Sequence, residues 1–217
     1  MIKNTEELIH NLSSDLSPVR PLRSPLIRSA LWVGILLPYT GLAIVVTALL
    51  IKRPIATLDR AFAIEQIFAL ATGIAAAMAA FASVIPGRSR SYLLWPVFPL
   101  AGWLGTLGES CLAAPPPAVT GHNLSCFPFI IFLGTAPAII LWKMLRRGAP
   151  LTPHMTAGLG ALAAAGVGNF CVRMVHQEDV TLMLLVWHVG GVFLLAFLSS
   201  MAGRYLLKWR SPESAVD

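Results

Sequence analysis

The side chains best suited to chemistry are three cysteines, together with a few imidazoles and carboxylates near them in the sequence. The cysteines are Cys111, Cys126 and Cys171. The neighbouring candidates are His122, His176, Glu178 and Asp179. Thiols and imidazoles bind soft or borderline metals, and paired thiols form disulfides in an oxidising compartment. Neither a CxxC nor an HExxH spacing occurs, which makes the signal for a metal site weak. Three alternatives stay open for Cys126 and Cys171: a disulfide, a metal site, or simple packing as small buried hydrophobes.

The usual catalytic arrangements do not occur in the sequence. It contains no glycine-rich phosphate loop, no GxSxG motif and no carboxylate pair within an apolar stretch. We therefore expect no enzyme and no cofactor, and we assign no metal site, while metal binding by Cys126 and Cys171 stays among the alternatives above.

One further titratable residue, His188, lies inside an apolar stretch. An ionisable group within a membrane span is a functional candidate by default. The alternative interpretation is a neutral imidazole that is hydrogen-bonded to a neighbouring helix. Glu65 and Gln66 are candidate partners.

The chain that must position these residues is strongly apolar. Of its 217 residues 56% are hydrophobic and 12% are charged, whereas about 25% is the usual charged fraction of a soluble domain. Six stretches approach or exceed the roughly 20 apolar residues that a membrane-spanning helix needs. They cover residues 30–51, 61–85, 91–111, 124–145, 154–175 and 180–204. We expect an all-α polytopic bundle of six transmembrane helices over 30–205, with a kink in the third where Pro96 and Pro99 interrupt it.

The basic residues predict the orientation of this bundle. Six spans place both chain ends on the same side of the membrane. The opposite side holds only four of the sixteen Lys and Arg residues, namely Lys52, Arg53, Arg60 and Arg173. Because positive residues accumulate on the cytoplasmic side, both termini are expected there. The net charge of +6 is then a topology signal, and we expect no direct binding of nucleic acid.

The first residues form a second feature, a short amphipathic helix. Asn4 and Glu7 have the spacing of a capping box. An apolar stripe follows, made of Leu8, Ile9, Leu12 and Leu16. A helix of about twelve residues is marginal alone in water, so the stripe needs a surface: the bilayer, the other helices of the chain, or a groove on another protein.

The polar face of this helix argues against simple adsorption to a membrane. It carries Glu6, Glu7, Asn11 and Asp15, whereas interfacial helices usually present Lys and Arg. The prolines of residues 18–25 then favour an extended tether. Two interpretations stay open, a solvated tail that rests on the bundle and a docking helix on a stiff strap.

Several segments, taken in order, resemble the NrsF-type anti-sigma factors. They are residues 8–12, Asp15, 18–22, Pro86-Gly87-Arg88, Cys126, 145–151, Ala157-Gly158, Glu178-Asp179 and Val186-Trp187. The resemblance covers essentially the whole chain. It implies a multi-pass protein of the bacterial inner membrane that holds an extracytoplasmic-function sigma factor inactive through its cytoplasmic part.

The resemblance also implies that cysteines on the outer side sense stress, and Cys126 matches the family pattern directly. The second family cysteine follows a histidine just before the Glu-Asp pair. This chain reads His176-Gln177-Glu178-Asp179 there, and Cys171 lies earlier.

These observations predict a membrane anti-sigma factor with a cytoplasmic segment over 1–29, a bundle over 30–205 and a cytoplasmic tail over 206–217. The expected partner-binding residues are Leu8, Ile9, Leu12, Leu16, Pro18, Val19, Arg20 and Leu22. Sensing is assigned to Cys126 and Cys171. The possible accessory residues are His122, His176, Glu178, Asp179 and His188. The alternatives are a small membrane transporter and a membrane thiol-redox protein.

Overall fold

The computed structural model describes residues 4–14, 21–52, 54–57, 59–113, 126–175 and 188–207. Every regular element in these ranges is helical, which confirms the all-α prediction. The elements are α1 (Asn4–Ser14), α2 (Pro25–Ile51), α3 (Arg60–Ser83), the 3-10 helix η1 (Arg90–Leu94), α4 (Val97–Ala113), α5 (Cys126–Leu145), α6 (Pro153–Arg173) and α8 (Gly190–Leu206).

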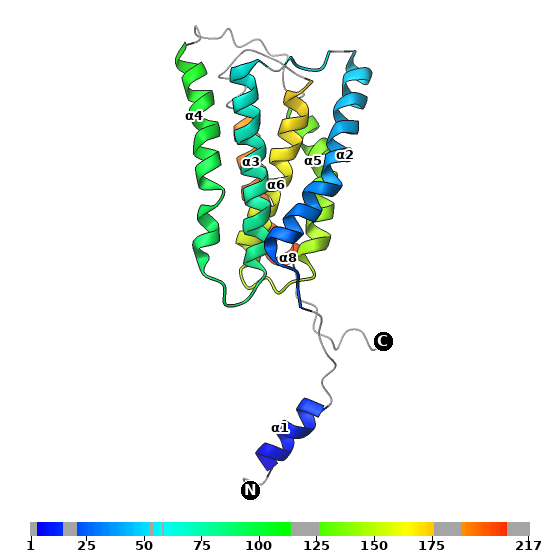
Figure 1. Cartoon of the computed structure of the whole chain (residues 1–217), viewed down its shortest axis with the longest axis vertical. Helices are drawn as coiled ribbons and strands as arrows, with labels where there is room; N and C mark the ends of the chain where they lie inside the picture. Colours follow the sequence, from blue (N-terminus) through cyan, green and yellow to red (C-terminus); the bar gives the residue numbers. More distant parts are fainter. Residues whose placement is uncertain are drawn as a thin grey trace.

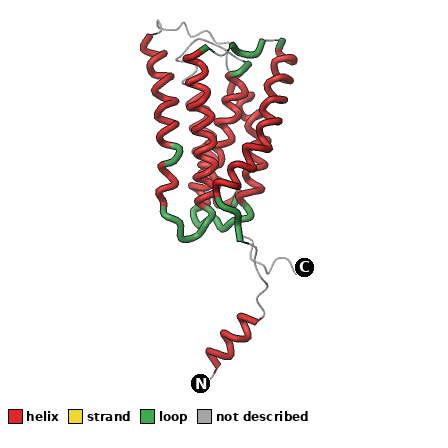
Figure 2. Tube along the Cα trace, in the orientation of Figure 1, coloured by secondary structure: helices red, strands yellow, loops and turns green. Residues whose placement is uncertain are grey.

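The long helices form one bundle in which consecutive helices run in opposite directions (Figures 1 and 2). We call the end at which α2 begins and α8 finishes the termini end, and the opposite end the far end. Helix α1 stands apart from the bundle, beyond the termini end (Figure 1).

Within the described residues, four helical segments are long and apolar enough to cross a membrane. They are Pro25–Ile51, Arg60–Ser83, Pro128–Leu145 and Pro153–Arg173. Helix α8 is apolar but has 17 residues, and α4 also has 17. The apolar helices support a membrane protein, and the count of six spans remains a prediction.

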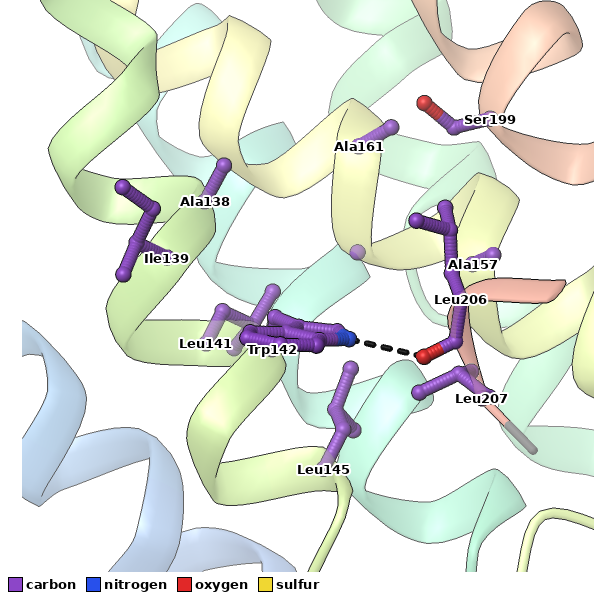
Figure 3. A pocket seen from close by; sticks show the side chains of 11 residues that line it. Ala138, Ile139, Leu141, Trp142, Leu145, Ala157, Ala161, Ser199, Leu206 and Leu207 are labelled. Atoms are coloured by element: carbon purple, nitrogen blue, oxygen red, sulfur yellow. Dashed lines mark hydrogen bonds between the residues drawn. The ribbon is translucent and has the colours of Figure 1, made fainter. Parts of the chain in front are cut away.

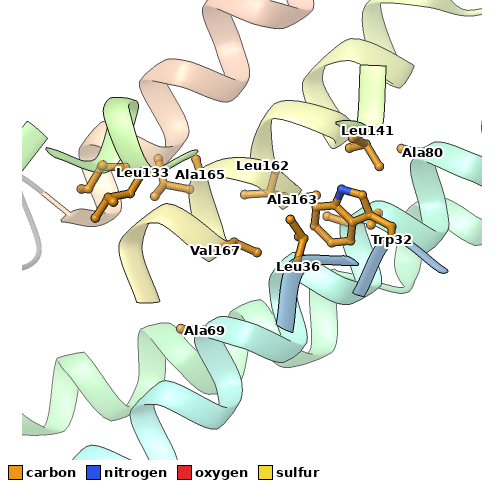
Figure 4. Close-up of a cluster of buried hydrophobic side chains, with 14 of the residues drawn as sticks. Trp32, Leu36, Ala69, Ala80, Leu133, Leu141, Leu162, Ala163, Ala165 and Val167 are labelled. Atoms are coloured by element: carbon orange, nitrogen blue, oxygen red, sulfur yellow. The ribbon is translucent and has the colours of Figure 1, made fainter. Parts of the chain in front are cut away.

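Helix α6 is the centre of the bundle and packs against α3, α5 and α8. Its small residues permit this, because close approach between helices in lipid depends on small side chains. A Cβ on Gly166 would lie 3.3 Å from the Gly73 Cα of α3, and one on Gly168 would lie 2.5 Å from the Ile130 carbonyl oxygen of α5. Figure 4 shows the alanines and Val167 of α6 among larger side chains such as Trp32 and Leu36 of α2.

Helix α2 is held to α5 by two hydrogen bonds at a proline. Pro137 lies inside α5 and has no N–H, so the carbonyl of Leu133, four residues earlier, loses its donor in the helix. The Tyr39 hydroxyl of α2 donates to this carbonyl at 2.8 Å. One turn further along α5, Trp32 Nε1 donates to the Pro137 carbonyl at 3.2 Å. The helix defect of α5 is thus an attachment site for α2.

The third apolar stretch differs from the expected single kinked helix. Residues 90–94 form η1, and α4 starts at Val97, directly after Pro96. The carbonyl of Pro96 accepts the first helical bond from Leu100 N at 3.0 Å. Pro99 lies in the first turn of α4, where a missing N–H removes no helical bond. The prolines therefore separate two elements instead of bending one.

Candidate functional site

The apolar stripe on α1 is exposed as far as the structure describes it. Leu8, Ile9 and Leu12 are 55%, 60% and 62% exposed. Glu6 and Glu7 lie in the first turn of the same helix, where carboxylates interact favourably with the helix dipole. Three large apolar side chains on a short helix away from the bundle form a surface that can be buried only against something else.

The strap that follows α1, residues 18–25, is described only from residue 21 onward. Leu16 of the predicted stripe and three predicted binding residues of the strap, Pro18, Val19 and Arg20, lie outside the described residues. Leu22 is 39% exposed. The strap ends where Ser24 caps α2, with its hydroxyl accepting from Ile27 N at 3.4 Å, and where Pro25 occupies the first turn.

The bundle begins at Pro25, earlier than the expected boundary at residue 30, and it includes Arg28. This side chain is 5% exposed. Its Nη2 donates to the Met144 carbonyl of α5, and its guanidinium lies 4.5 Å from the centroid of the Phe81 ring of α3. Among the described residues its Nη1 has no hydrogen-bond partner. Arg28 therefore ties the start of α2 into the bundle, next to the strap.

At the far end, the two predicted sensing cysteines lie on adjacent helices. Cys126 is the first residue of α5, and Cys171 lies in the last turn of α6. The Cys171 thiol is free and its residue is fully buried, with 0% exposure. The side chain of Cys126 lies outside the described residues, as do His122, His176, Glu178 and Asp179. Within the described part of the chain, no group of three His, Cys, Asp or Glu residues could hold a metal.

His188 precedes α8 and is buried, as the interpretation of a bonded imidazole expected. Its Nδ1 lies 2.6 Å from Asn169 Oδ1 of α6, so its observed partner is neither Glu65 nor Gln66. Asn169 is fully buried, and its Nδ2 has no partner among the described residues.

Glu65 instead pairs with Arg173 at the far end. Arg173 Nε and Nη2 lie 3.2 and 3.1 Å from the two carboxylate oxygens, and the side chains of Arg173 and Glu65 are only 8% and 12% exposed. Arg173 also lies 5.1 Å from the centroid of the Phe62 ring. Its charge is therefore matched within the bundle by a buried carboxylate.

Sequence reasoning missed two of these polar residues, Arg28 and Asn169. Arg28 precedes the purely apolar run and so falls within the tail that the sequence predicts. Asn169 is an amide in the middle of an Ala- and Gly-rich stretch, and this isolated polar residue is a usable signal. The described side chains provide an ion pair, attachment between helices and an exposed apolar stripe.

The comparisons with known proteins point to one family. The family model described as "Negative regulator of sigma F" (NrsF) matches residues 12–209. A curated relative, the "Anti-sigma-F factor NrsF" of Caulobacter vibrioides, is 34% identical over 86 residues. This alignment spans 39% of the chain and 40% of the relative, so less than half of either protein is covered. No solved structure matches the chain.

Proposed function

The chain belongs to the NrsF family of negative regulators of sigma F, and from this premise we propose that it sequesters an extracytoplasmic-function sigma factor through α1 and the strap. An anti-sigma factor acts on a protein, so any effect on DNA is indirect. The observation that carries the proposal is the exposed stripe of Leu8, Ile9 and Leu12.

The stripe supports helix-in-groove binding. Leu12 follows Ile9 by three residues and Leu8 by four, and anchors at i+3 and i+4 spacing are the pattern by which amphipathic helices enter grooves on partner proteins. Burial of each leucine or isoleucine side chain contributes roughly 1.5–3 kcal/mol. Part of this gain offsets the ordering of a helix that is marginal alone.

The charges of the segment support a specific orientation of the partner. Glu6 and Glu7 border the stripe at the start of α1. Arg20 and Arg23 follow in the strap, and we propose that they pair with acidic residues of the sigma factor. Opposite signs at the two ends of the segment favour one direction of docking over the other.

Replacing two leucines of the stripe tests this proposal. In the full-length chain, Leu8→Asp with Leu12→Asp should weaken sigma-factor capture at least about 100-fold, because two apolar anchors are lost and two charges would be buried. The measurements are co-purification of the sigma factor and repression of a sigma-dependent reporter.

The matched control is His10→Asp with Ser14→Asp. It introduces the same two charges at the same i, i+4 spacing, on the opposite face of α1. Capture should persist in this control. If both pairs of substitutions leave capture and repression unchanged, α1 is not the docking element.

We also propose that the far end receives the stress signal. Cys126 and Cys171 both lie there, on the adjacent helices α5 and α6. Cys171 is fully buried, so we assign the first contact with an oxidant or a thiophilic metal to Cys126. His122, His176, Glu178, Asp179 and His188 are accessory candidates in this scheme.

The sensing proposal has its own test. Cys126→Ser should either lock the sigma factor in the repressed state or release it, when reporter output is followed after oxidant or metal treatment. Cys111→Ser, a substitution of the third cysteine, serves as the control. An unaltered stress response in Cys126→Ser cells would remove Cys126 from the mechanism and leave the docking proposal untouched.

A further inference from the structure

An apolar groove opens at the termini end between α5 and α8 (Figure 3). Its volume is about 230 Å³. Ile139 and Leu141 line it from α5, and Leu206 and Leu207 line it at the end of α8. Trp142 crosses from one wall to the other, and its Nε1 donates to the Leu206 carbonyl at 2.8 Å.

The groove exists because α6 supplies a floor of small residues. Ala157, Gly160 and Ala161 lie between the two walls. These side chains are too short to fill the space that α5 and α8 leave above them. Around the groove the apolar surface continues outward, since Ile139 is 46% exposed and Leu198 is 51% exposed.

An exposed arginine stands at the mouth of the groove. Arg146 lies 4.8 Å from the centroid of the Trp142 ring, which itself lines the groove. The wall from α5 thus carries a cation at the termini end.

We propose that this groove binds an anionic phospholipid, with part of an acyl chain along the floor and the phosphate at Arg146. The inference rests on the membrane placement of the bundle. Basic pockets between transmembrane helices on the cytoplasmic side are known to bind anionic headgroups, and an exposed apolar groove in a bilayer is in contact with acyl chains.

Charge and size favour this occupant over the others. The lining is apolar except for Ser199 and the Trp142 indole N–H, so it offers little to a polar metabolite. Pockets for soluble ligands usually measure about 300–1,000 Å³. A second copy of this chain would bring its own Arg146 toward a like charge, whereas a phosphate neutralises this arginine.

Native mass spectrometry of the purified full-length chain tests the proposal. The chain is titrated with phosphatidylglycerol and, separately, with phosphatidylcholine, and bound lipids are counted. Phosphatidylglycerol should bind more tightly. Arg146→Gln should weaken its binding about fivefold, the value for one Lys or Arg near an anionic surface.

Arg88→Gln is the matched control. Arg88 also stacks on an indole, 5.7 Å from the centroid of the Trp95 ring, but it lies between α3 and η1, away from the groove. Its substitution should leave lipid binding unchanged. Ala161→Leu, which fills the floor, should weaken binding of both lipids.

Three outcomes would overturn the proposal. The first is equal binding of the two lipids. The second is an equal effect of Arg146→Gln and Arg88→Gln, which would indicate unspecific contact with surrounding lipid. The third is a dimer without bound lipid, which would assign the groove to a second copy. No sigma factor is present in this experiment, so its failure is separate from a failure of the docking proposal.

Discussion

Each buried charge or imidazole described in the bundle lies against a specific partner. Glu65 meets Arg173 across α3 and α6, and His188, two residues before α8, meets Asn169 of α6. A buried ion pair adds little net stability, because its attraction is offset by the loss of hydration. Replacing only one partner of the pair lowers stability strongly, since the remaining charge stays buried without its partner.

We therefore expect Glu65→Leu to lower the free energy of unfolding by about 3–5 kcal/mol. The double variant Glu65→Leu with Arg173→Leu should recover most of this loss. The measurement is a denaturant titration of the full-length chain in micelles, followed by circular dichroism. Arg60→Leu, an exposed charge in the first turn of α3, should stay within about 0.5 kcal/mol of the natural chain. A double variant less stable than Glu65→Leu would contradict this account.

At the scale of the elements, a proline in one helix determines how a second helix attaches. Pro137 deprives the Leu133 carbonyl of its helical donor, and Tyr39 supplies a hydroxyl from α2. A carbonyl without a donor is costly in lipid. The attachment of α2 thus depends on a defect in α5.

A double-mutant cycle measures this dependence. Tyr39→Phe should lower the free energy of unfolding by about 1–3 kcal/mol, since the Leu133 carbonyl would lose its partner. In a Pro137→Ala background the same substitution should have a smaller effect, because an alanine at this position provides the missing backbone N–H. The two effects are compared in the same micelle titration. Equal effects in both backgrounds would show that the hydroxyl acts independently of the proline.

At the scale of the whole molecule, the up-and-down arrangement separates the proposed sensing and docking functions. Both α2 and α8 meet the termini end, beyond which α1 lies, whereas Cys126 and Cys171 lie at the far end (Figure 1). A signal between them has to pass along the bundle. The central helix α6 contacts α3, α5 and α8, so it is the element through which we expect a change at the far end to be transmitted.

Reporter fusions test the placement in the membrane. Alkaline phosphatase inserted between Ala118 and Val119 should be active, because this enzyme matures outside the cytoplasm. The same reporter after Asp217 should be inactive, and green fluorescent protein there should fluoresce. Phosphatase inserted at Gly148, in the turn between α5 and α6, should also be inactive. An active phosphatase after Asp217 would contradict cytoplasmic termini.

Most of the helical plan could be predicted because helix formation in lipid is a local property. The expected stretches 61–85, 124–145 and 154–175 correspond closely to α3, α5 and α6. The stretch 91–111 forms η1 and α4 instead of one kinked helix. Hydropathy could not predict this, because it does not distinguish a proline that bends a helix from one that precedes the start of a helix. Only hydrogen bonding, here from Leu100 N to the Pro96 carbonyl, makes that distinction.

The sequence by itself determined the apolar helices, the charge asymmetry and the stripe of α1, since these depend on composition and on periodicity within one segment. Only the tertiary structure decided that Arg173 meets Glu65, that Tyr39 meets the Leu133 carbonyl and that a groove opens over Gly160. The physical reason is that such contacts depend on the rotation and depth of each helix relative to its neighbours. These are set by the joint packing of small and large residues from several helices.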